Sequence, residues 1–177
     1  RLRAIIPTLR TLQNSKVVML GHQSRPGKID FTNMEQHADR ISRLIGKKVK
    51  FISDICGDEA ISSIKNLKIG EMLFLDNIRM HDDENSMKKA SLEETAQSEI
   101  VRKLSSVIDV YVTDAFAASH RNSPSLTGFY DSVPCIAGHL MSKEISNLQI
   151  AVNDPPRPYI AILGGTKCDD SLKVAKN

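Results

Sequence analysis

Four short apolar runs of strand length alternate along this chain with segments of helical pattern. The runs are residues 16–20, 49–52, 72–75 and 109–113, and polar or turn-forming residues bound each of them. Strands and helices that alternate at this spacing favour right-handed βαβ crossovers, which produce a parallel sheet. The predicted fold class is therefore α/β: a three-layer, Rossmann-like parallel sheet with helices on both faces.

Helical segments flank these runs. Residues 1–14 place apolar side chains on one stripe, and a helix is also expected near 57–67. A third helix is predicted to open with a capping box formed by Thr32 and Glu35 and to end at Gly46.

The segment 81–91 is rich in Asp, Asn, Ser and Lys and predicts an exposed loop. It leads into another helix, opened by a second capping box of Ser91 and Glu94. After the fourth strand, residues 114–126 predict a long loop.

The pattern changes after Pro134. A helix is predicted over about 137–151, and the proline-rich stretch 153–158 cannot continue it. A new buried strand is predicted at 159–163. We therefore expect a first domain over 1–152, a linker over 153–158 and the start of a second domain over 159–177. Since the chain begins at Arg1 and ends within a helical pattern, we expect it to be a piece of a longer protein.

Composition excludes several classes. Hydrophobic residues make up 41% and charged residues 25% of the 177 residues, as in ordinary globular proteins. No apolar run approaches the ~20 residues that span a bilayer, and no signal-peptide pattern is present, so a cytoplasmic protein is expected. Its three widely spaced cysteines predict neither a disulfide framework nor a zinc site.

Basic residues follow three of the predicted strands. His22 and Arg25 follow the first, Arg79 follows the third, and His120 and Arg121 follow the fourth. These loops emerge at the carboxyl edge of a parallel sheet, where ligands bind. Converging arginines predict a site for a small polyanion, although an arginine taken alone is more often a solvated surface charge.

A glycine pair follows the predicted strand at 159–163. Gly164, Gly165 and Lys167 resemble a phosphate-binding turn, but a plain strand-to-helix turn fits equally well and no Walker A motif is present. No spacing of a catalytic nucleophile or of metal ligands is recognisable.

Five motifs, in order, resemble the N-terminal domain of phosphoglycerate kinase, most closely its archaeal branch. They are RLRAIIPTL at 1–9, GHQSRPG at 21–27, DNIR at 76–79, TDAFAASHR at 113–121 and LGGTK at 163–167. The resemblance implies the first domain of a two-domain hinge kinase that transfers a phosphoryl group reversibly between 1,3-bisphosphoglycerate and ADP in glycolysis and gluconeogenesis. It also implies that Mg-ATP and Mg-ADP are bound mainly by a C-terminal domain that this chain lacks.

The resemblance also implies site residues. A substrate-binding set is expected to hold 3-phosphoglycerate or 1,3-bisphosphoglycerate: Arg1, His22, Gln23, Ser24, Arg25, Arg79, His120 and Arg121. Arg1 and Lys167 are the implied catalytic residues, and Gly164, Gly165 and Lys167 the implied nucleotide-binding residues. This phosphotransferase chemistry requires positioning and charge neutralisation rather than a protein nucleophile.

The chain departs from the family pattern in two respects. The family's first strand, which lies in the middle of the sheet, is absent, so its two neighbours are expected to have unpaired edges. Ser171 stands where many relatives have a second lysine. The chain alone is therefore expected to be inactive or nearly so, and its oligomeric state is left open.

Two other interpretations remain. One is a non-catalytic polyanion-binding module that uses the same basic edge, although aromatic residues are only 5% and the net charge only +3, which disfavours nucleic acid. The other is a remnant retained for assembly.

Overall fold

The computed structural model describes residues 2–160 and residue 162. The chain divides into two compact units, Arg1–Glu144 and Ile145–Asn177, and all five strands lie within the first. In the part that is described, no helix is both long and apolar enough to cross a membrane. The predicted strand at 159–163 lies largely outside the described residues, and the glycine turn that follows it lies entirely outside them.

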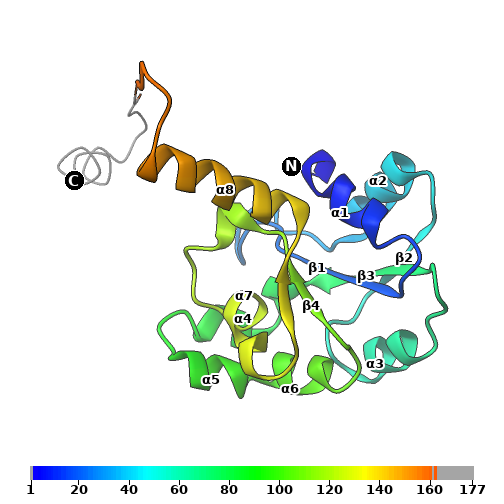
Figure 1. Ribbon diagram of the computed structural model, residues 1–177. Coiled ribbons are helices and arrows are strands. Elements are labelled where there is room, and N and C mark those ends of the chain that lie inside the picture. The colour runs from blue at the N-terminus through cyan, green and yellow to red at the C-terminus, as the bar shows by residue number, and fades with distance from the viewer. Residues whose placement is uncertain (1, 161, 163–177) are drawn as a thin grey trace. The chain divides into compact units, whose positions relative to one another are not determined.

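Strands and helices alternate along the described chain (Figure 1). Their bounds are η1 Leu2–Ile5, α1 Ile6–Thr11, β1 Val17–Gly21, α2 Glu35–Ile45, β2 Val49–Ile52, α3 Asp58–Lys65, β3 Met72–Asn77, η2 Ile78–Met80, α4 Asp82–Ser86, α5 Leu92–Ala96, α6 Glu99–Ser105, β4 Tyr111–Thr113, η3 Phe116–Ala118, α7 Pro124–Thr127, η4 Gly128–Asp131, β5 Cys135–Ala137 and α8 His139–Asn153.

All strand pairs among the described residues are parallel, as the alternating pattern predicts. Strand β3 lies between β1 and β2, and its Met72 is in register with both Val17 and Val49. Strand β4 pairs with β5, a three-residue strand that the sequence pattern does not predict. The α/β prediction is confirmed.

The strands form two sheets, β1-β3-β2 and β4-β5. Within residues 2–160, the edge of β1 opposite β3 and the edge of β4 opposite β5 have no strand partner. Both sheets contribute to one core, since Val18 and Leu20 of β1 and Tyr111 of β4 pack against the same buried cluster.

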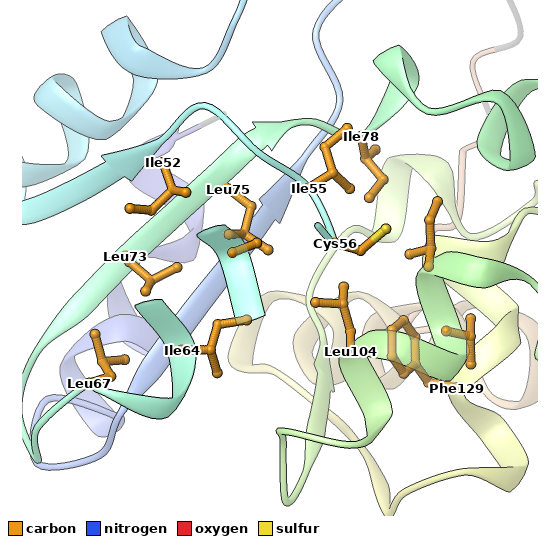
Figure 2. Packing of buried hydrophobic residues seen from close by; sticks show 13 residues of the cluster. Ile52, Ile55, Cys56, Ile64, Leu67, Leu73, Leu75, Ile78, Leu104 and Phe129 are labelled. Carbon is orange, nitrogen blue, oxygen red and sulfur yellow. The ribbon is translucent and has the colours of Figure 1, made fainter. Parts of the chain in front are cut away.

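Two apolar clusters cover the two faces of the three-stranded sheet. Helices α1 and α2 supply Leu9 and Ile41 to one face, where they join Phe74. On the other face, Leu73 and Leu75 of β3 pack with side chains of α3, α6 and η4. Figure 2 shows Leu104 and Phe129 on the side of this cluster opposite Leu73. Both faces are thus protected, which leaves the strand ends as the exposed rim.

The helix boundaries correct one prediction and confirm two others. Met34, not Thr32, is the N-cap of α2, and its backbone N–H donates to the buried carboxylate of Asp76 instead. Gly46 ends that helix in the left-handed conformation, as predicted. The capping box of Ser91 and Glu94 is present at the start of α5.

The predicted exposed loop at 81–91 is wrong, because it contains helix α4. This helix has five residues, three of them acidic in its first turn, so it carries no apolar stripe that periodicity could detect. One of its side chains, Glu84, is only 4% exposed.

Candidate functional site

The loop that follows β1 is fastened at its base by Asn77, the last residue of β3. Asn77 is fully buried, and its side-chain amide makes four hydrogen bonds. Its Oδ1 accepts from the backbone N–H groups of Gln23 and Arg79, while its Nδ2 donates to the carbonyl oxygens of Gln23 and Thr32, both at 2.8 Å. Both ends of the loop 22–33 are thereby held at the carboxyl edge of the sheet.

Ser24 occupies the turn of this loop with φ of 55°, in the left-handed region. Its hydroxyl donates to the carboxylate of Asp30, and the side-chain amide of Gln23 donates to the carbonyl oxygen of Asp30. These contacts bring residues 23–24 close to Asp30 and so fold the loop back on itself, and the next residue, Arg25, is exposed.

Three arginines approach one another from three loops. Arg79 lies in η2, directly after β3; burial lowers the pKa of its guanidinium, and the positive charges of Arg121 and Arg25 lower it further. Glu84 acts in the opposite direction. Among the described residues, none of these three guanidinium groups forms an ion pair. Within the described part of the chain, these positive charges therefore have no acidic side chain in contact.

Glu84 of α4 connects the loop of His22 to the segment of Ser123 and Ser125, which follows Arg121. Its Oε1 is 2.6 Å from His22 Nε2 and accepts hydrogen bonds from the hydroxyl groups of Ser123 (2.7 Å) and Ser125 (2.8 Å). Its Oε2 accepts from the backbone N–H of Ser125 at 3.0 Å. Burial acts to raise the pKa of Glu84, but the hydrogen bonds from His22, Ser123 and Ser125 outweigh it, so the pKa is lowered and the carboxylate is ionised.

The structure brings together most of the predicted substrate-binding residues within its described range. His22, Gln23, Ser24 and Arg25 lie in one loop, and the charges of Arg121 and Arg25 lower the pKa of Arg79. His120 is exposed, and no hydrogen bond or ion pair of its side chain is present among residues 2–160. Four predicted site residues lie outside the described residues: Arg1, Gly164, Gly165 and Lys167.

Sequence reasoning missed the residues that support the basic groups. Asn77 and Asp76 stand at the end of a strand and were noted only as neighbours of Arg79. The sequence places Glu84 in a predicted exposed loop, and no motif or pattern marks Ser123 or Ser125 as part of a site. Polar residues at the carboxyl end of a buried parallel strand are the one available indication, and it applies to Asn77 but not to Glu84.

This arrangement suits an anion. Unpaired guanidinium groups that converge on one edge match phosphate and carboxylate oxygens. Among the described residues, no three His, Cys, Asp or Glu side chains are grouped to hold a metal ion. Cys56 is buried with a pKa raised to about 11, chiefly by burial, so in the described core it stays a neutral thiol at physiological pH.

Comparison with known proteins gives consistent matches over the whole chain. The family model described as phosphoglycerate kinase matches residues 1–177. Phosphoglycerate kinases of Methanothermus fervidus and Pyrococcus furiosus are 43% and 44% identical over 179 residues. Each alignment covers 100% of this chain and 43% of the relative.

Solved structures agree with these matches. The crystal structure of phosphoglycerate kinase from Pyrococcus horikoshii OT3 superposes with a TM-score of 0.95 at 44% identity, covering 99% of this chain and 44% of that one. The structure from Coxiella burnetii, at 24% identity and a TM-score of 0.76, shares the fold. The chain spans less than half the length of these relatives.

Proposed function

The chain belongs to the phosphoglycerate kinase family, and we propose that it supplies the phosphoglycerate-binding part of that enzyme. The whole protein would transfer a phosphoryl group reversibly between 1,3-bisphosphoglycerate and ADP, a step of glycolysis and gluconeogenesis. This chain alone would bind substrate but be inactive or nearly so, because it spans only 43% of its relatives.

One observation carries the proposal: at the carboxyl edge of the sheet, Arg79 of η2 lies close enough to Arg25 and Arg121, from two other segments, for their positive charges to lower its pKa. Such proximity costs electrostatic free energy unless an anion is bound there. A phosphate group satisfies three guanidinium groups through its oxygens, and guanidinium forks match it bidentately.

Each residue then has a distinct role. Arg25, Arg79 and Arg121 bind the 3-phosphate of the substrate together with His22, and Gln23 and Ser24 shape the loop that lines it. Arg1 would reach the carboxyl end of the substrate and the migrating phosphoryl group. Lys167 would neutralise phosphate oxygens during transfer, and His120 would border the substrate.

The nucleotide belongs largely to the part of the family that this chain does not span. Mg-ADP or Mg-ATP supplies the second phosphoryl partner and the metal charge that phosphoryl transfer requires. Gly164, Gly165 and Lys167 would form the beginning of that site. The residues of this chain contribute position and charge, and none of them needs to act as a nucleophile.

Isothermal titration calorimetry with 3-phosphoglycerate tests the proposal. We expect saturable binding, no binding of glycerate, which lacks the phosphate, and sharply weaker binding in both Arg25→Ala and Arg121→Ala. Arg10→Ala, which removes a positive charge from α1, is the matched control and should bind like the parent chain. Equal affinity of the parent and both loop variants would overturn the assignment.

Nucleic acid is the comparison ligand. A surface that binds RNA shows a steep fall of affinity with salt, because phosphate contacts release counter-ions. RNA binding with such a slope and no response to 3-phosphoglycerate would replace the enzyme assignment by a polyanion-binding module.

A further inference from the structure

The Glu84 carboxylate is the point at which three site-bearing segments meet. It lies on α4, accepts from His22 at the end of β1, and accepts from Ser123 and Ser125 beyond Arg121. All these contacts place a donor on the carboxylate, which has only acceptor capacity when ionised. The hydrogen on His22 in this contact is therefore on Nε2.

The other ring nitrogen of His22 is in a different situation. Ser125 Oγ lies 3.1 Å from Nε2 and already donates to Glu84, so it too can only accept from Nε2–H. Within residues 2–160, Nδ1 has no hydrogen-bond partner, and the side chain is 21% exposed. In the neutral ring with a hydrogen on Nε2, Nδ1 carries a lone pair and repels an anion.

The charges around His22 determine whether its ring takes up a proton when an anion binds. Glu84 carries the negative charge that lies against His22 Nε2, and the positive charges of this edge are those of Arg25 on the same loop, Arg79 on η2 and Arg121 after η3. Tyr111 of β4 donates its hydroxyl to the carbonyl oxygen of Ser125, and burial, the largest cause, raises the pKa of that phenol, so it stays neutral. A bound anion neutralises the guanidinium groups and leaves the attraction of Glu84 uncompensated.

We propose that Glu84 is a positioning residue that makes anion binding at this site proton-coupled: it holds His22 through Nε2, and Nδ1 takes up a proton as the anion binds against it. The result is an imidazolium between two negative groups, the buried carboxylate and the ligand. The proposed function is needed only to identify the anion as a phosphoglycerate.

Inorganic sulfate is the probe, because it does not titrate near neutral pH and so cannot itself exchange a proton. Calorimetry at about pH 7.5 in two buffers of different ionisation enthalpy, neither of them an oxyanion, measures protons taken up per sulfate bound. We expect uptake of roughly 0.5–1 proton, with sulfate affinity falling up to about tenfold per pH unit as the pH rises.

Glu84→Gln keeps the size of the side chain and removes its charge. Its amide can donate to Nε2, which moves the ring hydrogen to Nδ1 without proton uptake, so we expect uptake near zero and a nearly flat pH dependence. Glu99→Gln is the matched control: its carboxylate also lies beside a histidine, 3.7 Å from His81 Nε2, but is 45% exposed. Uptake in that variant should equal that of the parent.

A spectroscopic measurement covers the case in which Glu84→Gln does not fold. In the parent chain, ¹⁵N signals of His22, assigned with His22→Gln, should report hydrogen on Nε2 alone before sulfate and on both nitrogens after it. Sulfate binding without uptake, or hydrogen on Nδ1 alone in the free chain, would overturn this inference and leave the proposed function standing. Failure of both sulfate and 3-phosphoglycerate to bind would overturn both.

Discussion

The side-chain amide of Asn77 is hydrogen-bonded to both backbone groups of Gln23, accepting from its N–H at 3.1 Å and donating to its carbonyl oxygen at 2.8 Å. The amide thus pairs with the chain as a neighbouring strand would. It does so at the point where β1 has ended and its loop begins. This contact keeps the loop of Arg25 next to the η2 turn of Arg79.

Asn77→Asp tests that fastening. The carboxylate cannot donate, so the carbonyl oxygens of Gln23 and Thr32 lose their donor and face a negative group in a buried site. Each unsatisfied buried group costs about 1–3 kcal/mol, so we expect the free energy of unfolding in urea to fall by about 2–5 kcal/mol. Asn66→Asp, at the exposed end of α3, should change it by less than about 0.5 kcal/mol. A loss at Asn77 no greater than that at Asn66 would show that the amide does not hold the loop.

The left-handed conformation of Ser24 predicts an inverted preference between glycine and alanine. In this conformation a residue with a Cβ lowers the free energy of unfolding by roughly 1–2 kcal/mol, whereas glycine does not. Ser24→Gly should therefore unfold at higher urea concentration than Ser24→Ala. At Ser62, exposed within α3, the order should be reversed by about 1 kcal/mol in favour of alanine. The same order at both positions would contradict the conformation of the loop.

The sequence predicted the sheet well because strand-length apolar runs and their polar boundaries are local signals. Strands at 16–20, 49–52 and 72–75 lie within a residue or two of β1, β2 and β3. Strand β5 was missed because three residues are too short for a period to show. The division into two sheets depends on hydrogen bonds between distant segments and is visible only in the structure.

The sequence predicted the basic residues of the candidate site but not the buried polar residues that hold them in place. Arginines that follow parallel strands can be predicted as site residues from the sequence, because the topology brings the ends of those strands together. Glu84 does not, because its burial results from His22, Ser123 and Ser125, which are 39 or more positions away. Thr32 failed as a cap for a similar reason: the carboxylate of Asp76, from β3, takes the donor that a local cap would have taken.

Asp54 predicts a defined acid response of stability. Burial acts to raise its pKa, but backbone N–H groups of Ala60, Gly57 and others at the start of α3 outweigh that effect, so the pKa is lowered. A carboxyl with a lowered folded-state pKa stabilises the protein fully above its ordinary value of 3.8 and loses that contribution as pH falls through the folded value.

Asp54→Asn should therefore cost about 1–2 kcal/mol in free energy of unfolding at neutral pH, as loss of a helix cap does. The difference from the parent should shrink as the pH falls below the ordinary carboxyl value. Urea titrations across that range measure it, with Glu59→Gln on the exposed face of α3 as the reference. A difference that stays constant with pH would contradict the role of the ionised Asp54 carboxylate at the start of α3.

Gly138 predicts a steric effect between β5 and α8. A Cβ at this position would lie 2.4 Å from the Asp114 side chain, which accepts from Met141 N–H and from the Thr8 hydroxyl. Gly138→Ala should displace Asp114 and lower the free energy of unfolding by more than about 2 kcal/mol. Faster amide hydrogen exchange at the start of α8 should accompany it. Ala137→Ser, on the exposed adjacent residue, is the control, and equal exchange in the two variants would refute the contact.

The most direct test of the account is the affinity of this chain for 3-phosphoglycerate when Arg79 is changed. Arg79→Ala removes a charge-assisted contact worth about 1.5–3 kcal/mol, so calorimetry should show binding about 10- to 150-fold weaker than in the parent. Arg102→Ala, which removes an exposed charge from α6, should bind within about twofold of the parent. If Arg79→Ala instead binds as the parent does while its circular dichroism spectrum and melting curve are unchanged, the convergence of arginines at the sheet edge is not the phosphoglycerate site.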